Sequence, residues 1–118
     1  MNANASPLAP AAPAIQAPPV PRTLADTGIA PVMLRDILLK TMFRMNLEHV
    51  SDLARICCLP APLIQELIDI ARGQKLLEAT GTLHATSSTE MGYQLTEGGK
   101  SRALDALAQS EYYGAVPV

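Results

Sequence analysis

Aromatic residues are scarce in this sequence: its 118 residues include no tryptophan, one phenylalanine and three tyrosines. A core built by this chain must therefore consist mainly of leucine, isoleucine, valine, methionine and alanine side chains. Helices packed through leucine and alanine suit that inventory better than a large β-sheet does, because strands favour β-branched and aromatic residues. The length fits one small domain with tails, and the composition indicates that this domain is mainly helical.

The sequence also lacks a surplus of basic residues and any long hydrophobic run. Its formal net charge is −2 and its pI is about 5.6, whereas a dedicated nucleic-acid-binding protein usually carries a basic surplus or a basic stripe. No apolar run approaches the roughly 20 residues that span a bilayer, and no basic region precedes an apolar stretch at the N-terminus, as in a secretory signal. DNA is therefore a disfavoured partner, a membrane is not expected as one, and the expected location is the cytoplasm.

Only two cysteines occur, and these two, Cys57 and Cys58, are neighbours. Neighbouring cysteines close a strained ring and rarely form a structural disulfide, and no further ligand lies at zinc-site spacing. Free thiols fit a reducing cytoplasm. The histidines, His49 and His84, lie far apart in the sequence, and the carboxylates are scattered singly. No catalytic, cofactor-binding or metal-binding residue is therefore predicted, and the chain is not expected to be an enzyme.

Residues 1–22 form a leader rich in alanine and proline, which contains most of the ten prolines of the chain. Proline removes backbone donors and blocks helices, while alanine offers little area to bury. The composition therefore predicts a disordered or extended tether. A docking peptide for a proline-binding module is the alternative.

Three amphipathic segments follow the leader. In residues 31–45 the apolar positions recur at helical spacing, and Pro31 suits a first helical turn. Ser51 is a candidate N-cap for a short second helix. A third helix begins near Pro62 and is expected to end at Gly73, a residue type suited to a C-cap. The residues expected to face inward are Leu34, Ile37, Leu38, Met42 and Met45 in the first helix, Leu53, Ala54, Ile56 and Cys57 in the second, and Leu63, Ile64, Leu67, Ile68 and Ala71 in the third.

A hairpin and a last helix complete the pattern. The apolar stretches KLLEAT and YQL flank a polar, turn-rich segment, which predicts two strands joined by a flexible tip. Thr96 is expected to cap a helix that has Gly98 and Gly99 in its first turn. The residues of this helix expected to face the core are Ala103, Leu104, Leu107 and Ala108.

The predicted fold is mainly α with a small β-hairpin. Its order is helix, helix, helix, hairpin, helix, which is the layout of a winged helix-turn-helix domain. We expect this domain over residues 23–110, after the disordered Ala/Pro-rich leader. The step Y-x-L-T-x-x-G after the hairpin resembles the same segment of many bacterial winged-helix proteins.

The C-terminal stretch SEYYGAVPV resembles a linker, S-x-Y-x-G-P-A-P-V, of a group of bacterial AAA-type ATPases, from which it departs at Ala115 and Val116. The stretches LRDILLK and LTEGGKSRAL are also similar to the N-terminal domain of that group. The resemblance implies an N-terminal winged-helix domain, with residues 111–118 as a linker towards a downstream ATPase module. The ATPase residues themselves cannot be transferred, because the chain has no G-x-x-x-x-G-K-[ST] motif.

The surface that a winged helix would present to DNA is not basic in this sequence. From Ala61 to Gly92, which covers the third helix and the hairpin, the formal charge is −2; the acids are Glu66, Asp69, Glu78 and Glu90, and the bases are Arg72 and Lys75. Such a surface would repel phosphates instead of releasing counterions. The predicted tip contains His84 but no arginine or lysine.

We therefore predict a non-enzymatic regulatory module that binds a protein partner. The third helix is apolar on more than one face, and the two tyrosines after the last helix have the amphipathic character common at interfaces. The residues predicted to contact the partner are Gln65, Glu66, Asp69, Arg72, His84, Tyr112 and Tyr113.

Two alternatives remain open. One is a DNA-binding transcription regulator that uses Gln65, Arg72 and Lys75, and the other is self-association. The first two helices could add a small basic patch, although a solvated face is the simpler interpretation; its members would be Arg35, Lys40, Arg44 and Arg55.

Overall fold

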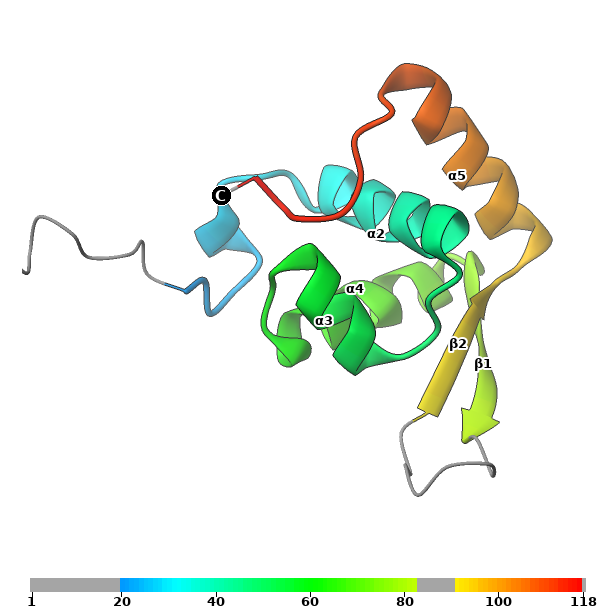
Figure 1. The fold of residues 1–118 in the computed structure, drawn as a ribbon, viewed down its shortest axis with the longest axis horizontal. Helices are drawn as coiled ribbons and strands as arrows, with labels where there is room; N and C mark the ends of the chain where they lie inside the picture. Colours follow the sequence, from blue (N-terminus) through cyan, green and yellow to red (C-terminus); the bar gives the residue numbers. More distant parts are fainter. Residues whose placement is uncertain (1–19, 83–90, 118) are drawn as a thin grey trace, which may run out of the picture.

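The computed structural model describes residues 20–82 and 91–117, and it is mainly helical with a two-stranded antiparallel hairpin, as the sequence predicts (Figure 1). Residues 1–19 of the predicted leader, 1–22, lie outside the described residues, and its last three residues precede the first helical element. None of the helices in the described ranges is long and apolar enough to cross a membrane. In chain order the elements are η2 (Ala25–Thr27), α2 (Pro31–Met45), α3 (Val50–Cys57), α4 (Ala61–Gly73), β1 (Leu77–Thr82), β2 (Met91–Leu95) and α5 (Glu97–Gln109).

Helix α2 lies between α5 on one side and the α3–α4 pair on the other (Figure 1). Its predicted apolar stripe is buried except at Met45, which is 41% exposed because the helix ends there and the next residue, Asn46, turns the chain through a left-handed conformation (φ 55°). Lys40, expected on a solvated face, is instead buried at 5% exposure. Its Nζ donates to the carbonyl oxygen of Ser110 at 3.0 Å, which gives the ammonium group a hydrogen-bond acceptor.

Two predicted helix caps are wrong, although the predicted end of α4 at Gly73 is confirmed. Helix α3 begins directly after His49, so Ser51 lies inside the first turn instead of capping it. The backbone of His49 is extended and bridges to Gly92 of β2, and this pairing places the start of the helix. Helix α4 ends at Gly73, but this glycine is the last helical residue and not the C-cap, which is Gln74; Lys75 then takes the left-handed conformation (φ 63°).

The hairpin pairs Leu77 with Leu95 at its base and Thr82 with Met91 at its outer end, with an irregularity between Ala79 and Gly81. Of the predicted tip, residues 83–90, including His84, lie outside the described residues. Its outer residues belong to the strands instead, because Gly81 pairs with Gly92 and Thr82 with Met91.

Helix α5 begins at the predicted cap, because the Thr96 hydroxyl oxygen accepts a hydrogen bond from the Gly99 N–H at 3.0 Å. Ala103 and Leu107 are buried as expected. Leu104 is 53% exposed and Ala108 is exposed as well, which corrects the prediction for both residues. The helix packs on α2 through residues spaced three and four apart, and Leu104 lies one position off that stripe.

Residues 110–117, which the resemblance implies to be a linker, pack against α2 and α3. The Gly114 N–H donates to the buried Thr41 hydroxyl at 2.9 Å, and the Val116 N–H donates to the Cys57 carbonyl at 2.9 Å. Val116 itself is only 6% exposed. This segment is therefore part of the folded unit.

Glycine is required at position 99 by a close approach of two backbones. A Cβ atom built there would lie 2.0 Å from the Leu76 carbonyl oxygen, whereas one built on Gly98 would lie no closer than 3.7 Å to a neighbouring atom. Gly99→Ala should lower the free energy of unfolding by at least about 2 kcal/mol, because backbone must move. Gly98→Ala, the matched control, should leave it unchanged or raise it by up to about 1 kcal/mol, since alanine favours the helix. Urea unfolding of both variants tests this; equal effects would contradict it.

The stability of the fold should also depend on the ionisation of Cys57. Burial raises the pKa of this thiol from 9.0 to about 11, so between these pH values the folded protein keeps a proton that the unfolded chain releases. The resulting stabilisation is fully present below pH 9 and is lost as the pH rises towards 11, at no more than about 1.4 kcal/mol per pH unit.

Urea unfolding at pH 8 and pH 10 in the presence of a reductant measures this loss. Wild-type protein should lose about 1 kcal/mol more over this interval than Cys57→Ala does. Cys58→Ala should behave like wild type, because Cys58 is exposed. Identical losses in wild type and Cys57→Ala would contradict the prediction.

Candidate functional site

Four of the predicted partner-binding residues lie together on the outward side of α4; we call them the α4 face, and they are Gln65, Glu66, Asp69 and Arg72. Glu66, Asp69 and Arg72 are exposed, and Gln65 is half-buried. Gln65 Nε2 donates to Asp69 Oδ1 at 3.1 Å, across one helical turn. The structure therefore brings these four residues into one surface.

The α4 face is joined to the hairpin by Tyr93, whose side chain is buried at 5% exposure. Its hydroxyl oxygen accepts a hydrogen bond from Gln65 Nε2 at 3.3 Å, and the guanidinium carbon of Arg72 lies 5.7 Å from its ring centroid. This distance is within the range of a cation–π contact. The sequence places Tyr93 on a predicted strand, and nothing in the sequence pairs it with Gln65, which lies 28 positions before it.

Three arginines around this surface contact other side chains of the chain, whereas Lys75, named for the DNA-binding alternative, is exposed directly after α4. Arg72 lies over Tyr93, and the guanidinium of Arg35 bonds both Asp36 at 2.9 Å and the Gln74 side chain at 2.9 Å. Arg55 lies within 3.5 Å of Asp52. Lys40 is buried beneath Ser110, so it cannot contribute to the small basic patch considered from the sequence.

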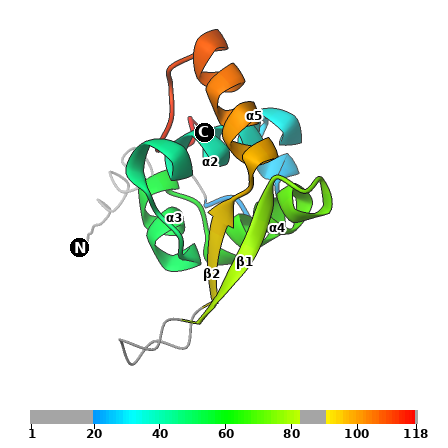
Figure 2. The ribbon, with the colours of Figure 1, turned by 90° about the vertical axis from the view of Figure 1, so that its right-hand side faces the viewer.

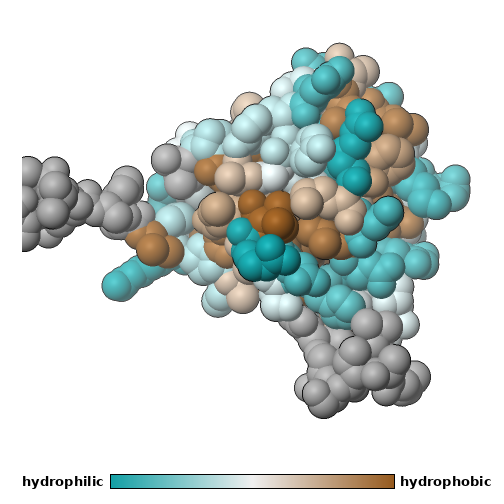
Figure 3. All heavy atoms as spheres, viewed as in Figure 1, coloured by the Kyte–Doolittle hydropathy of each residue, from teal (hydrophilic) through white to brown (hydrophobic). Residues whose placement is uncertain are grey.

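The remaining predicted partner-binding residues lie elsewhere. Tyr112 lines a cavity of about 260 Å³ formed by α2, α5 and the C-terminal segment, with no residue of α4. Tyr112 and Tyr113 are 46% and 39% exposed, so neither is fully packed on its own domain. On the face shown in Figure 3, hydrophobic residues gather over the middle of the molecule and over α5, with hydrophilic side chains around them.

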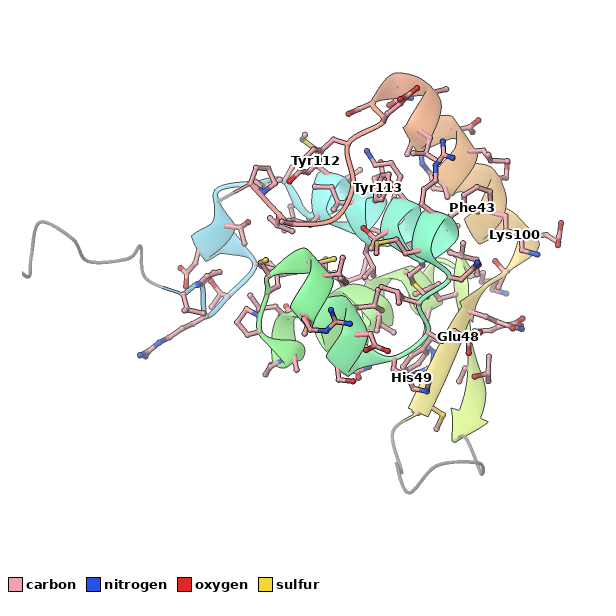
Figure 4. The ribbon with its side chains drawn as sticks, viewed as in Figure 1. Phe43, Glu48, His49, Lys100, Tyr112 and Tyr113 are labelled. Atoms are coloured by element: carbon pink, nitrogen blue, oxygen red, sulfur yellow. The ribbon has the colours of Figure 1, made fainter. Side chains whose placement is uncertain are left out.

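A larger cavity, of about 570 Å³, opens on the other side of β2, and we call it the β2 groove. Phe43, Leu47 and Glu48 line it from the end of α2 and the following loop. Gln94 and Leu95 of β2 line it as well, and so do the first residues of α5. Figure 2 looks onto this side of the molecule, where β2 lies between the α2–α3 connection and β1. Figure 4 shows Phe43, Glu48 and Lys100 entering the region from three different segments.

The edge of β2 that faces the groove is paired for only part of its length. The Tyr93 N–H donates to the Glu48 carbonyl at 2.9 Å, and His49 bridges to Gly92. The chain before Glu48 then leaves the strand edge through the left-handed Asn46. The groove opens where this pairing stops.

The described residues include no group of three or more histidine, cysteine or acidic side chains placed to hold a metal ion. The chain matches no protein-family model, no curated protein and no solved structure.

The contact between Arg72 and Tyr93 predicts a measurable coupling. A double-mutant cycle with Arg72→Ala and Tyr93→Leu, followed by urea unfolding, should give a coupling energy of about 0.5–1 kcal/mol. The control cycle replaces Arg72→Ala by Arg55→Ala, whose guanidinium pairs with Asp52 instead, and it should give a coupling near zero. Equal couplings in the two cycles would show that the guanidinium does not interact with the ring.

Proposed function

We propose that this chain is a non-enzymatic winged-helix module that docks a protein partner. The order of its elements supports this, because two short helices followed by a hairpin and a last helix match the helix-turn-helix and wing of that fold. In such a fold α4 would be the recognition helix and the hairpin the wing. A fold alone does not specify a function, so the proposal depends on the chemistry of the α4 face.

The main support for the proposal is the distribution of charged side chains on the α4 face. Glu66 and Asp69 are exposed, and Arg72 is held over the Tyr93 ring. A DNA-binding surface needs free cations that neutralise phosphates and release counterions. Here two exposed carboxylates outnumber the single cation of the face, which lies over an aromatic ring, and this excess of negative charge favours a protein partner over DNA.

We further propose that the module belongs to a bacterial AAA-type ATPase and acts in the cytoplasm. The resemblance of residues 110–118 to the linker of that group supports the first part, and the two free cysteines support the second. Because residues 114 and 116 bond to α2 and α3, a module that follows the chain would be attached to the same helices that carry α4. The open reading frame tests this part: a G-x-x-x-x-G-K-[ST] motif downstream of codon 118 is expected, and a stop codon there would contradict it.

The DNA-binding alternative rests on the fold alone. Reversing charges on the α4 face can distinguish DNA binding from protein docking. Wild-type protein should bind a mixed-sequence 20-base-pair duplex more weakly than about 10⁻⁴ M at physiological salt. Glu66→Lys combined with Asp69→Lys should bind it more tightly, with a logarithm of affinity that falls linearly with the logarithm of salt concentration. Fluorescence anisotropy at several salt concentrations measures both.

The matched control combines Asp105→Lys with Glu111→Lys, two exposed acids away from α4. This control has the same net charge as the α4 double variant but should gain less affinity for DNA. Tight, salt-sensitive binding by wild type would overturn protein docking as the function. Equal gains in the two double variants would overturn the assignment of α4 as a recognition helix.

A further inference from the structure

We propose that the β2 groove binds an extended, lysine- or arginine-rich segment of the partner protein. This inference rests on the proposed docking function, but it names a different surface from the α4 face and the chemistry of its ligand. Three properties of the groove support it: its charge, its apolar lining and the open edge of β2.

The charge of the groove is negative. Its lining includes three glutamates and one lysine, so its formal charge is −2. The cation, Lys100, lies 3.5 Å from Glu97 within α5, and Glu78 accepts a hydrogen bond from Gln94 Nε2 at 2.7 Å. The side chain of Glu48 is exposed and lines the groove from the loop after α2. A cationic ligand would therefore meet a complementary field, whereas an anionic one would be repelled.

The apolar part of the lining suits the stems of long basic side chains. Phe43, Leu47 and Leu95 are each half-buried, so each leaves part of its apolar surface in the groove. Lysine and arginine can lay their methylene stems on such surface while the charged end reaches a carboxylate. The Phe43 ring adds a face suited to a cation.

The strand edge specifies the shape of the ligand. In an antiparallel strand the N–H and C=O of alternate residues point to the same edge. Since Tyr93 bonds Glu48 along that edge, the backbone groups of Leu95 point to it too. Because the chain leaves the edge at Asn46, a short extended segment can take the place of a third strand there, by β-augmentation.

The test uses an eight-residue peptide of alternating lysine and valine, with a peptide of alternating glutamate and valine as its control. Binding to the full chain is measured by fluorescence anisotropy, and the contact site by changes in amide NMR shifts. The lysine peptide should bind and should shift the amide signals of Leu95 and Phe43, whereas the glutamate peptide should do neither. Absence of lysine-peptide binding would overturn the proposal.

Two double variants locate the site. Glu48→Gln with Glu97→Gln should weaken binding of the lysine peptide at least about tenfold, which corresponds to loss of about 1.4 kcal/mol. Glu66→Gln with Asp69→Asn removes the same charge from the α4 face and should weaken it less than about threefold. Thermal unfolding confirms that both variants fold. Equal weakening, or a larger loss in the α4 variant, would overturn the groove as the site.

The polyamine spermidine separates a backbone contact from a purely ionic one. It carries positive charges but has no peptide backbone, so it should bind at least about tenfold more weakly than the lysine peptide. Equal binding would overturn the β-augmentation. The two proposals are tested by different results. Tight DNA binding by wild-type protein would overturn the docking function, whereas the peptide measurements alone would overturn the groove as a binding site.

Discussion

The corner at which α4, β1, β2 and α5 meet determines the rest of the structure. The Thr96 hydroxyl accepts from the Gly99 N–H and donates to the Lys75 carbonyl at 2.7 Å, and the Thr96 N–H donates to the Leu76 carbonyl at 3.1 Å. The missing side chain of Gly99 lets α5 lie directly on the Leu76 backbone. These contacts fix the direction in which the hairpin leaves the helices. The position of Tyr93 under the α4 face and the opening of the β2 groove both follow from that direction.

Local chemistry made much of this fold predictable. The helical spacing of apolar residues in α2 and α4, the Thr96 cap and the two strands are confirmed, because each depends on residues a few positions apart. The capping roles predicted for Ser51 and Gly73 are wrong for the opposite reason, although α4 does end at Gly73. His49 bridges to distant Gly92, and the Leu76 N–H bonds the Ala71 carbonyl at 2.8 Å beyond the predicted cap. In both places a contact made by the folded chain outweighs the local preference.

The sequence predicts which side chains of the candidate site face outward, but it does not predict the contacts that these side chains make. The helical period of α4 is enough to turn Glu66 and Asp69 outward. The engagement of Arg72 by Tyr93 depends on how the hairpin crosses α4, and a single sequence does not specify that crossing. The same limit applies to Lys40, whose burial depends on a carbonyl 70 residues later, and to the β2 groove, which three separate segments form.

The two surfaces beside β2 differ in what they can contribute to binding. Both carry an excess of carboxylates, so both attract a cationic partner over roughly a Debye length, about 8–10 Å. The α4 face, with its side chains exposed or tied to Tyr93, offers charge on a helix surface. The β2 groove adds apolar area and an unfilled strand edge, which restrict the ligand to an extended chain. Both surfaces can therefore attract a cationic partner. Of the two, the β2 groove is the one that can select a ligand by shape, because its strand edge is open where the pairing with Glu48 stops.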